Sequence, residues 1–309
     1  MRIKVAVQTS SLELLSEALK SGCTGVRFGA EFCEQLLPDL SVLGKAYELA
    51  CEEGKEFTYV TPRLSNAGIK KLGEQFSFLN EKGKVSVVVN DLGALNMLRL
   101  HPNLYPHLGR NLFLVPVRSP WAEGYIQKQD PSSEIGRWVR DLFSTTSLNY
   151  PATIELYRQY GCQKADVDWV PRILPSLVIL VEGALRFLLH LHLVPITFTR
   201  KCHMARFLGE ENPETCSKPC LTRAFLLRNK VLEEYGVDFF LGGNTVFRLV
   251  QPSGRDIVDL EKIGVAELIL TMNPITRIYT QGSIDSMISD MMEGAPDHIM
   301  RVPLSSRPS

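Results

Sequence analysis

The chain has 309 residues, of which 45% are hydrophobic and 22% charged, with 34 basic and 34 acidic side chains. This composition is typical of a soluble globular protein with one large core or two ordinary ones. Because the charges balance, no overall field attracts nucleic acid or an anionic membrane, and a nucleic-acid-binding function is disfavoured. The seven cysteines have no regular spacing, which suits reduced thiols in the cytoplasm better than disulfides.

One apolar stretch, residues 174–195, has the length of a membrane span. It is interrupted by Glu182, Arg186, His190 and His192. Each charge at the centre of a bilayer costs about 2.5–3.5 kcal/mol, so a membrane span is disfavoured. The stretch is better explained by a buried strand, a helix and another strand.

Along the first part of the chain, short β-like runs alternate with helical patterns. The predicted strands cover residues 3–7, 26–28, 57–61, 85–89 and 112–115. The predicted helices run from a capping box at Ser10 and Glu13 to Gly22, from 40 to 53, from 67 to 82, and onward from an N-cap at Asp91.

Strands of continuous Val and Ile that alternate with helices about every 25 to 30 residues predict parallel βα units. Further units are expected at 167–173, 193–199, 237–241 and 266–270. The resulting eight or nine steps predict an α/β fold of the (β/α)8 TIM-barrel type, with some distortion. A doubly wound sheet is less consistent, because no Gly-x-Gly-x-x-Gly motif follows the first strand.

The domain organisation follows from where this rhythm stops. Residues 118–146 break it and are interpreted as an insertion. We predict a single barrel-like domain over residues 1–295 and a loose tail over residues 296–309.

Three cysteines, in the pattern Cys202-x13-Cys216-x3-Cys220, lie in a polar segment rich in turn-forming residues. An irregular loop can bring thiolates to a soft metal from several directions, so the pattern indicates a metal site. The basic neighbours, which we expect to lower the thiol pKa values, are Arg200, Lys201, Arg206 and Lys218.

A fourth sulfur ligand must come from elsewhere in the chain. Cys23, Cys51 and Cys162 lie in or beside helical patterns, whereas Cys33 follows an apolar run where a strand would end in a loop. Loops at strand ends converge on functional sites in α/β folds, which favours Cys33. Zinc and iron–sulfur both remain open. The thirteen-residue gap is unlike paired C-x2-C zinc knuckles and favours a cluster, with scattered reduced thiols as the alternative.

Other candidate residues have weaker signals. His190 and His192 would share one strand face as a metal pair, but buried structural histidines explain them at least as well. Asp91 is explained by its role as a helix cap, and Arg206 by an exposed loop position or by a contact with a cluster sulfur or a substrate carboxylate. The sequence contains no recognisable hydrolytic triad, Walker loop or H-E-x-x-H motif.

Several segments, in this order, resemble the collagenase-like peptidase superfamily, whose mechanism is unknown. The similarity extends with gaps over most of residues 1–275, and the cysteine set is its most specific part. The segments are VRFGAEFC, VVVNDLGALNML, SLNYPATIELYRQYG, VPITFTRKCHMAR and ETCSKPC.

The resemblance implies a barrel-like fold and a [4Fe–4S] cluster on Cys33, Cys202, Cys216 and Cys220. Within the superfamily, the chain is most similar to the branch that acts in oxygen-independent hydroxylation during ubiquinone biosynthesis. That branch implies a heterodimer with a paralogous chain, a small-molecule substrate or hydroxyl donor, and a redox subunit rather than a hydrolase. Other members hydroxylate RNA bases or are classed as peptidases, and these remain the alternative functions. No catalytic residue is assigned.

Overall fold

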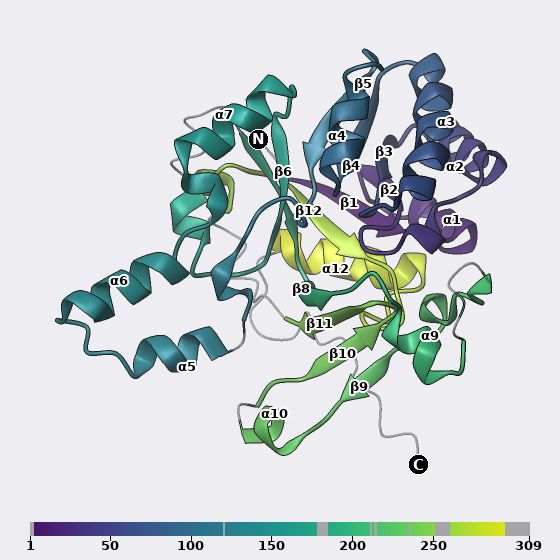
Figure 1. The fold of residues 1–309 in the computed structure, drawn as a ribbon. Coiled ribbons are helices and arrows are strands. Elements are labelled where there is room, and N and C mark those ends of the chain that lie inside the picture. Colours follow the sequence, from purple (N-terminus) through teal and green to yellow (C-terminus); the bar gives the residue numbers. More distant parts are fainter. Residues whose placement is uncertain are drawn as a thin grey trace.

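Eight parallel strands close into a barrel in the order β1-β12-β7-β6-β5-β4-β3-β2. The computed structural model describes residues 3–119, 121–177, 185–210, 212, 215–234, 236–250 and 260–293. Helices lie between successive strands on the outside of the barrel (Figure 1). The protein therefore has the (β/α)8 TIM-barrel fold that the alternating pattern predicted.

The barrel strands are β1 (Lys4–Thr9), β2 (Gly25–Gly29), β3 (Glu56–Val60), β4 (Val85–Val89), β5 (Leu104–Leu108), β6 (Lys164–Asp168), β7 (Arg186–His190) and β12 (Val265–Thr271). The helices around them include α1 (Leu12–Lys20), α2 (Leu40–Glu52), α3 (Asn66–Lys82), α4 (Leu92–Leu98), α7 (Pro151–Gln159) and α12 (Gln281–Glu293).

The helices pack on the barrel through apolar faces with helical spacing. In α3, the fully buried residues Leu72, Phe76 and Leu79 lie on one face, and each contributes roughly 1.5–3 kcal/mol of burial free energy. Asp91 caps α4, as predicted, because its carboxylate accepts from the backbone N–H groups of Gly93 and Ala94.

The predicted capping box at Ser10 and Glu13 was wrong. Helix α1 begins after Ser11, whose side chain makes no capping hydrogen bond. Thr9 instead accepts a hydrogen bond from the Ser11 backbone N–H and orders the entry to the helix.

The fifth strand was also misplaced. It is β5 at residues 104–108, which the sequence concealed because the strand contains Pro106 and His107. Residues 112–115 form no strand, and their apolar character serves packing, since Phe113 and Val115 are buried.

Two predicted barrel units belong to a second sheet. Strands β8 (Leu193–Phe198) and β10 (Phe239–Gly242) pair with β9 (Phe225–Leu227) and β11 (Thr245–Leu249) in the antiparallel order β8-β11-β10-β9. This sheet is inserted between β7 and β12. Composition marked these segments as strands, but it does not reveal which partner a strand pairs with.

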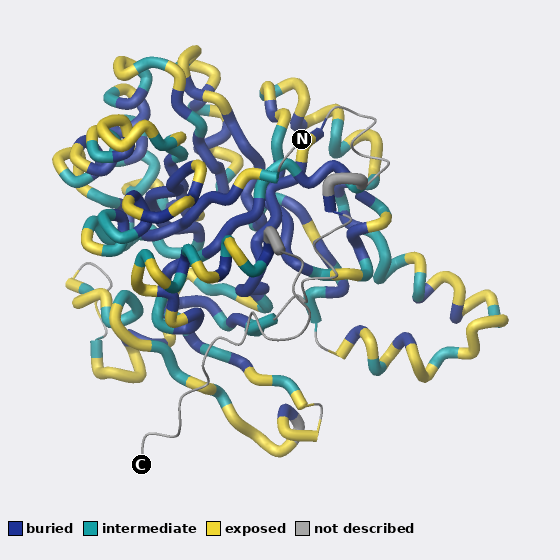
Figure 2. Tube along the Cα trace, turned by 180° about the vertical axis from the view of Figure 1, so that it is seen from behind, coloured by how far each residue is buried: buried dark blue, intermediate teal, exposed yellow. Residues whose placement is uncertain are grey.

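Residues 118–146 lie between β5 and β6 and contain α5 (Trp121–Gln127) and α6 (Glu134–Phe143). The two helices form an arm that projects from the barrel (Figure 1). Figure 2 shows that this arm is largely exposed, whereas buried residues are concentrated in the barrel.

The apolar stretch at 174–195 contains β7 and the start of β8, while residues 178–184 and the predicted tail at 296–309 lie outside the described residues. None of the described helices combines the length and apolar character needed to cross a membrane.

Gly29 closes β2 in a conformation that only glycine tolerates. Its φ is +128°, and an added Cβ would lie 2.1 Å from the carbonyl oxygen of Val60 in the neighbouring strand. We predict that Gly29→Ala lowers the free energy of unfolding by about 3 kcal/mol or more, through backbone strain and overlap. Chemical denaturation measures this loss.

The matched control for this substitution is Gly54→Ala. Gly54 also has a positive φ, of +63°, but nothing lies within 4 Å of an added Cβ. Its cost should be about 1 kcal/mol. Equal losses in the two variants would contradict the assigned overlap with Val60.

Candidate metal centre

Cys33 lies just beyond the carboxyl end of β2. The strand ends at Gly29, and the chain then turns through Cys33 into a short 3-10 helix, Glu34–Leu36. Burial raises the pKa of the Cys33 thiol to about 11, although the backbone N–H groups of Gln35 and Leu36 point toward its sulfur and oppose the rise.

The other three cysteines of the predicted centre lie on the segment that joins β8 to β9. Cys202 is the N-cap of helix α9 (His203–Phe207), and its Sγ accepts from the Ala205 backbone N–H at 3.4 Å. The Sγ of Cys216 accepts from the Lys218 backbone N–H, also at 3.4 Å. Cys220 lies on the 3-10 helix Pro219–Leu221.

The fold brings these four partly buried cysteines together. After burial, the main influences that raise the pKa of Cys220, to about 12, are the neighbouring charges of Cys33, Cys202 and Cys216. Cys202 and Cys216 act on Cys33 in the same way. The four sulfurs are therefore near enough to repel one another when ionised, and a bound cation would remove that repulsion.

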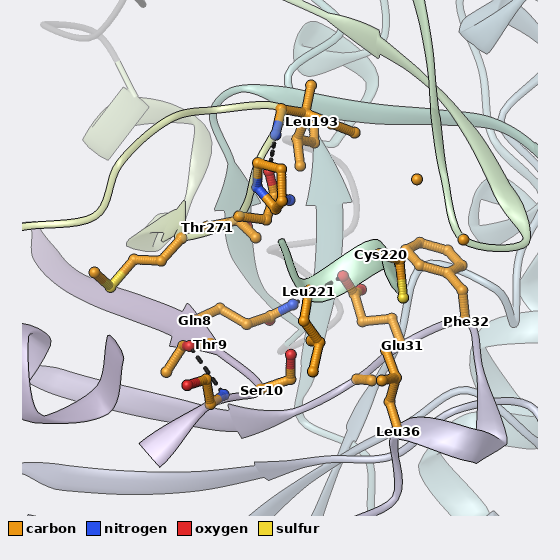
Figure 3. Close-up of a pocket in the computed structure, with 18 of the residues that line it drawn as sticks. Gln8, Thr9, Ser10, Glu31, Phe32, Leu36, Leu193, Cys220, Leu221 and Thr271 are labelled. Atoms are coloured by element: carbon orange, nitrogen blue, oxygen red, sulfur yellow. Dashed lines mark hydrogen bonds between the residues drawn. The ribbon is translucent and has the colours of Figure 1, made fainter. Parts of the chain in front are cut away.

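Two cavities adjoin these sulfurs. A small cavity of about 110 Å³ is lined by Cys33, Cys202 and Cys216. A larger one, of about 670 Å³, opens at the mouth of the barrel and is lined by Cys33 and Cys220. Figure 3 shows Cys220 in this cavity, near Glu31 and Phe32. Cys33 therefore lies between the small cavity and the large one.

The predicted effect of the basic neighbours was wrong for three of the thiols. The pKa values of Cys33, Cys216 and Cys220 are raised, with burial as the largest cause. The four basic side chains are exposed, so water screens their charges. They are Arg200, Lys201, Arg206 and Lys218.

The spacing of the sulfurs bears on which metal group they fit. Among the described residues, Glu31, Asp166 and His190 alone bring three potential ligand atoms within 4.8 Å of one another, so no three cysteine sulfurs are that close. Around a single tetrahedral zinc, with Zn–S near 2.3 Å, the sulfurs would be about 3.8 Å apart. The four sulfurs therefore do not lie at the separations of a preformed single-zinc site.

The remaining cysteines lie apart from this centre. Cys23 and Cys162 are buried, and Cys51 is exposed on α2. The Cys23 thiol lies 3.3 Å from the carbonyl oxygen of Ala18, to which it donates.

A buried ion-pair network underlies the larger cavity. Arg110, which follows β5, donates from Nε to Glu31 Oε1 at 3.0 Å and from Nη1 to Asp168 Oδ1 at 2.7 Å. Gln8 Nε2 donates to Glu31 Oε2 at 3.0 Å, and Arg118 Nε donates to Asp168 Oδ2 at 2.5 Å. Burial alone would raise the pKa of Glu31, but the Arg110 guanidinium lowers it to about 2.

A second buried group lies deeper in the barrel. Arg27 of β2 pairs with Asp166 of β6, which also contacts His190 Nε2 at 3.1 Å. Burial lowers the pKa of His190 well below its usual value, with the Arg110 charge as the next cause, so this imidazole is neutral near pH 7.

Charged residues at alternate positions of two strands could have indicated these networks from the sequence. Asp166 and Asp168 alternate with the apolar residues Ala165 and Val167 in β6, and Arg27 lies between Val26 and Phe28. In a barrel strand, alternate side chains point inward, so these charges had to face one another in the interior.

Of the other candidate residues, one histidine belongs to a buried polar group, and the remaining ones do not. His190 and His192 are both buried, but β7 ends at His190, and only His190 belongs to the group with Glu31 and Asp166. Arg206 is exposed on α9.

Comparison with known proteins does not assign a function to this site. The sequence matches no protein-family model and no curated protein. Among solved structures, the thiamine phosphate pyrophosphorylase from Pyrococcus furiosus is similar, with 10% sequence identity, a TM-score of 0.43, and coverage of 94% of this chain and 96% of that chain. A similarity of this size says nothing about activity, and the resemblance to the collagenase-like superfamily stays a prediction from the quoted segments.

The lowered pKa of Glu31 makes the free energy of unfolding depend on pH. Because its pKa falls from 4.5 to about 2 on folding, the stabilisation is present above pH 4.5 and is lost as pH falls toward 2. We predict that Glu31→Gln lowers the free energy of unfolding at pH 7 by about 3 kcal/mol, since it leaves Arg110 partly uncompensated. Denaturant melts at several pH values should show this difference shrinking between pH 4.5 and 2.

The control is Glu74→Gln, an exposed carboxylate on α3. It should follow the wild-type protein at every pH. A Glu31→Gln deficit that stays constant from pH 7 to 2 would contradict the assigned role of this carboxylate.

Proposed function

We propose that the chain is an iron–sulfur protein that holds a [4Fe–4S] cluster on Cys33, Cys202, Cys216 and Cys220. The observation that carries the proposal is that these four cysteines are neighbours around two adjoining cavities at the mouth of the barrel, although Cys33 is far from the others in sequence. No three of their sulfurs lie as close together as in a single-zinc site, and the thirteen-residue gap between Cys202 and Cys216 favours a cluster over paired zinc knuckles.

The residues around the sulfurs suit this role. Ala205 and Lys218 donate backbone hydrogen bonds to Cys202 and Cys216, the kind of contact that tunes a thiolate ligand. When bound, such a cluster supplies one-electron transfer or structural support, because four cysteine ligands leave no open position on iron. Partial burial of the sulfurs limits their contact with solvent.

The larger cavity supports a small-molecule role beside the centre. Its walls combine apolar side chains, such as Phe32, Phe247 and Ile275, with the polar groups of Gln8 and Thr271. This combination is typical of a binding site for a small organic molecule. A substrate in the cavity would contact Cys33 and Cys220, close enough for electron exchange with a group held there.

By its motifs, the protein resembles UbiV, so we further propose a role in oxygen-independent hydroxylation in the cytoplasm. The chain would act as a redox subunit beside a UbiU-like paralogue. A peptidase role is less consistent with the site, because the described lining of the large cavity contains no histidine to activate a serine or cysteine nucleophile.

Iron analysis of the full chain tests this proposal. After anaerobic purification, we expect about four irons and four acid-labile sulfides per wild-type chain, with a broad visible absorption. Cys216→Ala should lose most of this iron and the absorption, because it removes one of four ligands.

The matched control is Cys51→Ala, since Cys51 is an exposed cysteine outside the centre. It should retain the full iron content. A colourless wild-type protein that holds stoichiometric zinc would contradict the redox proposal and favour a structural-metal role. If Cys51→Ala also lost its iron, the binding would not reside in the four assigned sulfurs.

A further inference from the structure

Asn244 occupies the junction of the segments that carry the cysteines. It lies in the two-residue turn, Gly243–Asn244, that joins β10 to β11, and it is buried. Its Nδ2 donates to the carbonyl oxygen of Phe32 at 2.7 Å and to that of Thr199 at 2.6 Å. Phe32 directly precedes Cys33, and Thr199 leads into the loop of Cys202.

The same turn also contacts the third segment. Gly243 has a φ of +65°, which a tight hairpin favours at this position, and an added Cβ there would lie 3.4 Å from Cys220 Sγ. The Gly243 carbonyl oxygen accepts from the backbone N–H of Met204, in the helix that Cys202 caps. One hairpin turn therefore touches the segments of Cys33, Cys202 and Cys220.

The position of Asn244 relative to the cavities also places it among the cysteine segments. Phe32, Cys33 and Asn244 are shared by the linings of the small and the large cavity. The amide thus lies at the boundary between the space that the sulfurs surround and the space open to a ligand.

We propose that Asn244 is a positioning residue for the four-cysteine centre: its side-chain amide ties the Cys33 segment to the Cys202 segment and so sets the separation of their sulfurs. This inference rests on the proposed function, in that the centre holds a metal cluster. The amide nitrogen of Asn244 carries two N–H donors, one for each carbonyl oxygen.

Asn244→Asp is the sharpest substitution, because it keeps the shape of the side chain and removes both donors. A carboxylate would face two carbonyl oxygens and repel them, which would move the two segments apart. Contacts that orient metal ligands typically contribute 10- to 100-fold in metal affinity, so we expect the variant to lose iron to a chelator roughly tenfold faster, or more, than the wild-type protein.

Asn90→Asp separates positioning from a general loss of stability. Asn90 is also buried, and its Nδ2 donates to the Thr61 carbonyl oxygen at 2.9 Å rather than to a segment that carries a cysteine. Its Oδ1 accepts from the Asn111 backbone N–H, and an aspartate would keep that bond. Asn90→Asp should lower thermal stability yet keep wild-type iron content and the electron paramagnetic resonance spectrum of the reduced protein.

Thiol labelling of the metal-free full chain gives a second readout. If Asn244 holds the segments, Asn244→Asp should label faster at Cys33 and Cys202, located by mass spectrometry, with Cys51 unchanged. Should Asn244→Asp fail to fold, Asn244→Ser, which keeps one donor without adding a charge, is expected to show intermediate rates of iron loss and of labelling.

The outcomes distinguish this inference from the proposed function. Wild-type protein that holds no iron would overturn the proposed function, whereas faster labelling of metal-free Asn244→Asp would still support the positioning role. Iron retention, spectrum and labelling equal to wild type in Asn244→Asp would overturn the role of Asn244. So would equal iron loss in Asn244→Asp and Asn90→Asp.

Discussion

The guanidinium of Arg110 holds together the end of the barrel at which the candidate centre lies. It follows β5 and binds Glu31 beyond β2, Asp168 at the end of β6, and the carbonyl oxygen of Leu193 at the start of the second sheet. Removing these charges from water offsets much of their attraction, so the network contributes more to geometry than to net stability. Because Glu31 lies two residues before Cys33, that geometry fixes where the loop of Cys33 begins.

The topology of the barrel explains why distant cysteines meet. All strands of a parallel barrel have their carboxyl ends at one face, and loops from several strands converge there. Cys33 follows β2, and the second sheet is inserted after β7, so both open at this face. The segment with the other three cysteines joins β8 and β9, the outer strands of that sheet, and the β10–β11 turn lies beneath it. The barrel supplies one sulfur from a fixed loop, and the inserted sheet supplies three.

The charged interior of the barrel is separate from its sulfur-lined mouth. The buried pairs Arg27–Asp166 and Arg110–Glu31 fill the barrel beneath the large cavity with compensated charge. The cavity walls are largely apolar, and a ligand there would lie beside Cys33 and Cys220.

The sequence by itself determined the fold class and most local elements, although not β5 or the start of α1, because period, glycine stops and caps such as Asp91 act over a few residues. It also singled out Cys33, Cys202, Cys216 and Cys220, since thiols in a polar loop and at a strand end are distinctive. Only the tertiary structure decided that β8 and β10 leave the barrel, that Arg110 joins three strand ends, and that Asn244 lies between the cysteine segments. These features depend on contacts between residues far apart in the chain. No local pattern encodes which partner a strand or an amide will meet, because that choice is made by the closure of the whole barrel.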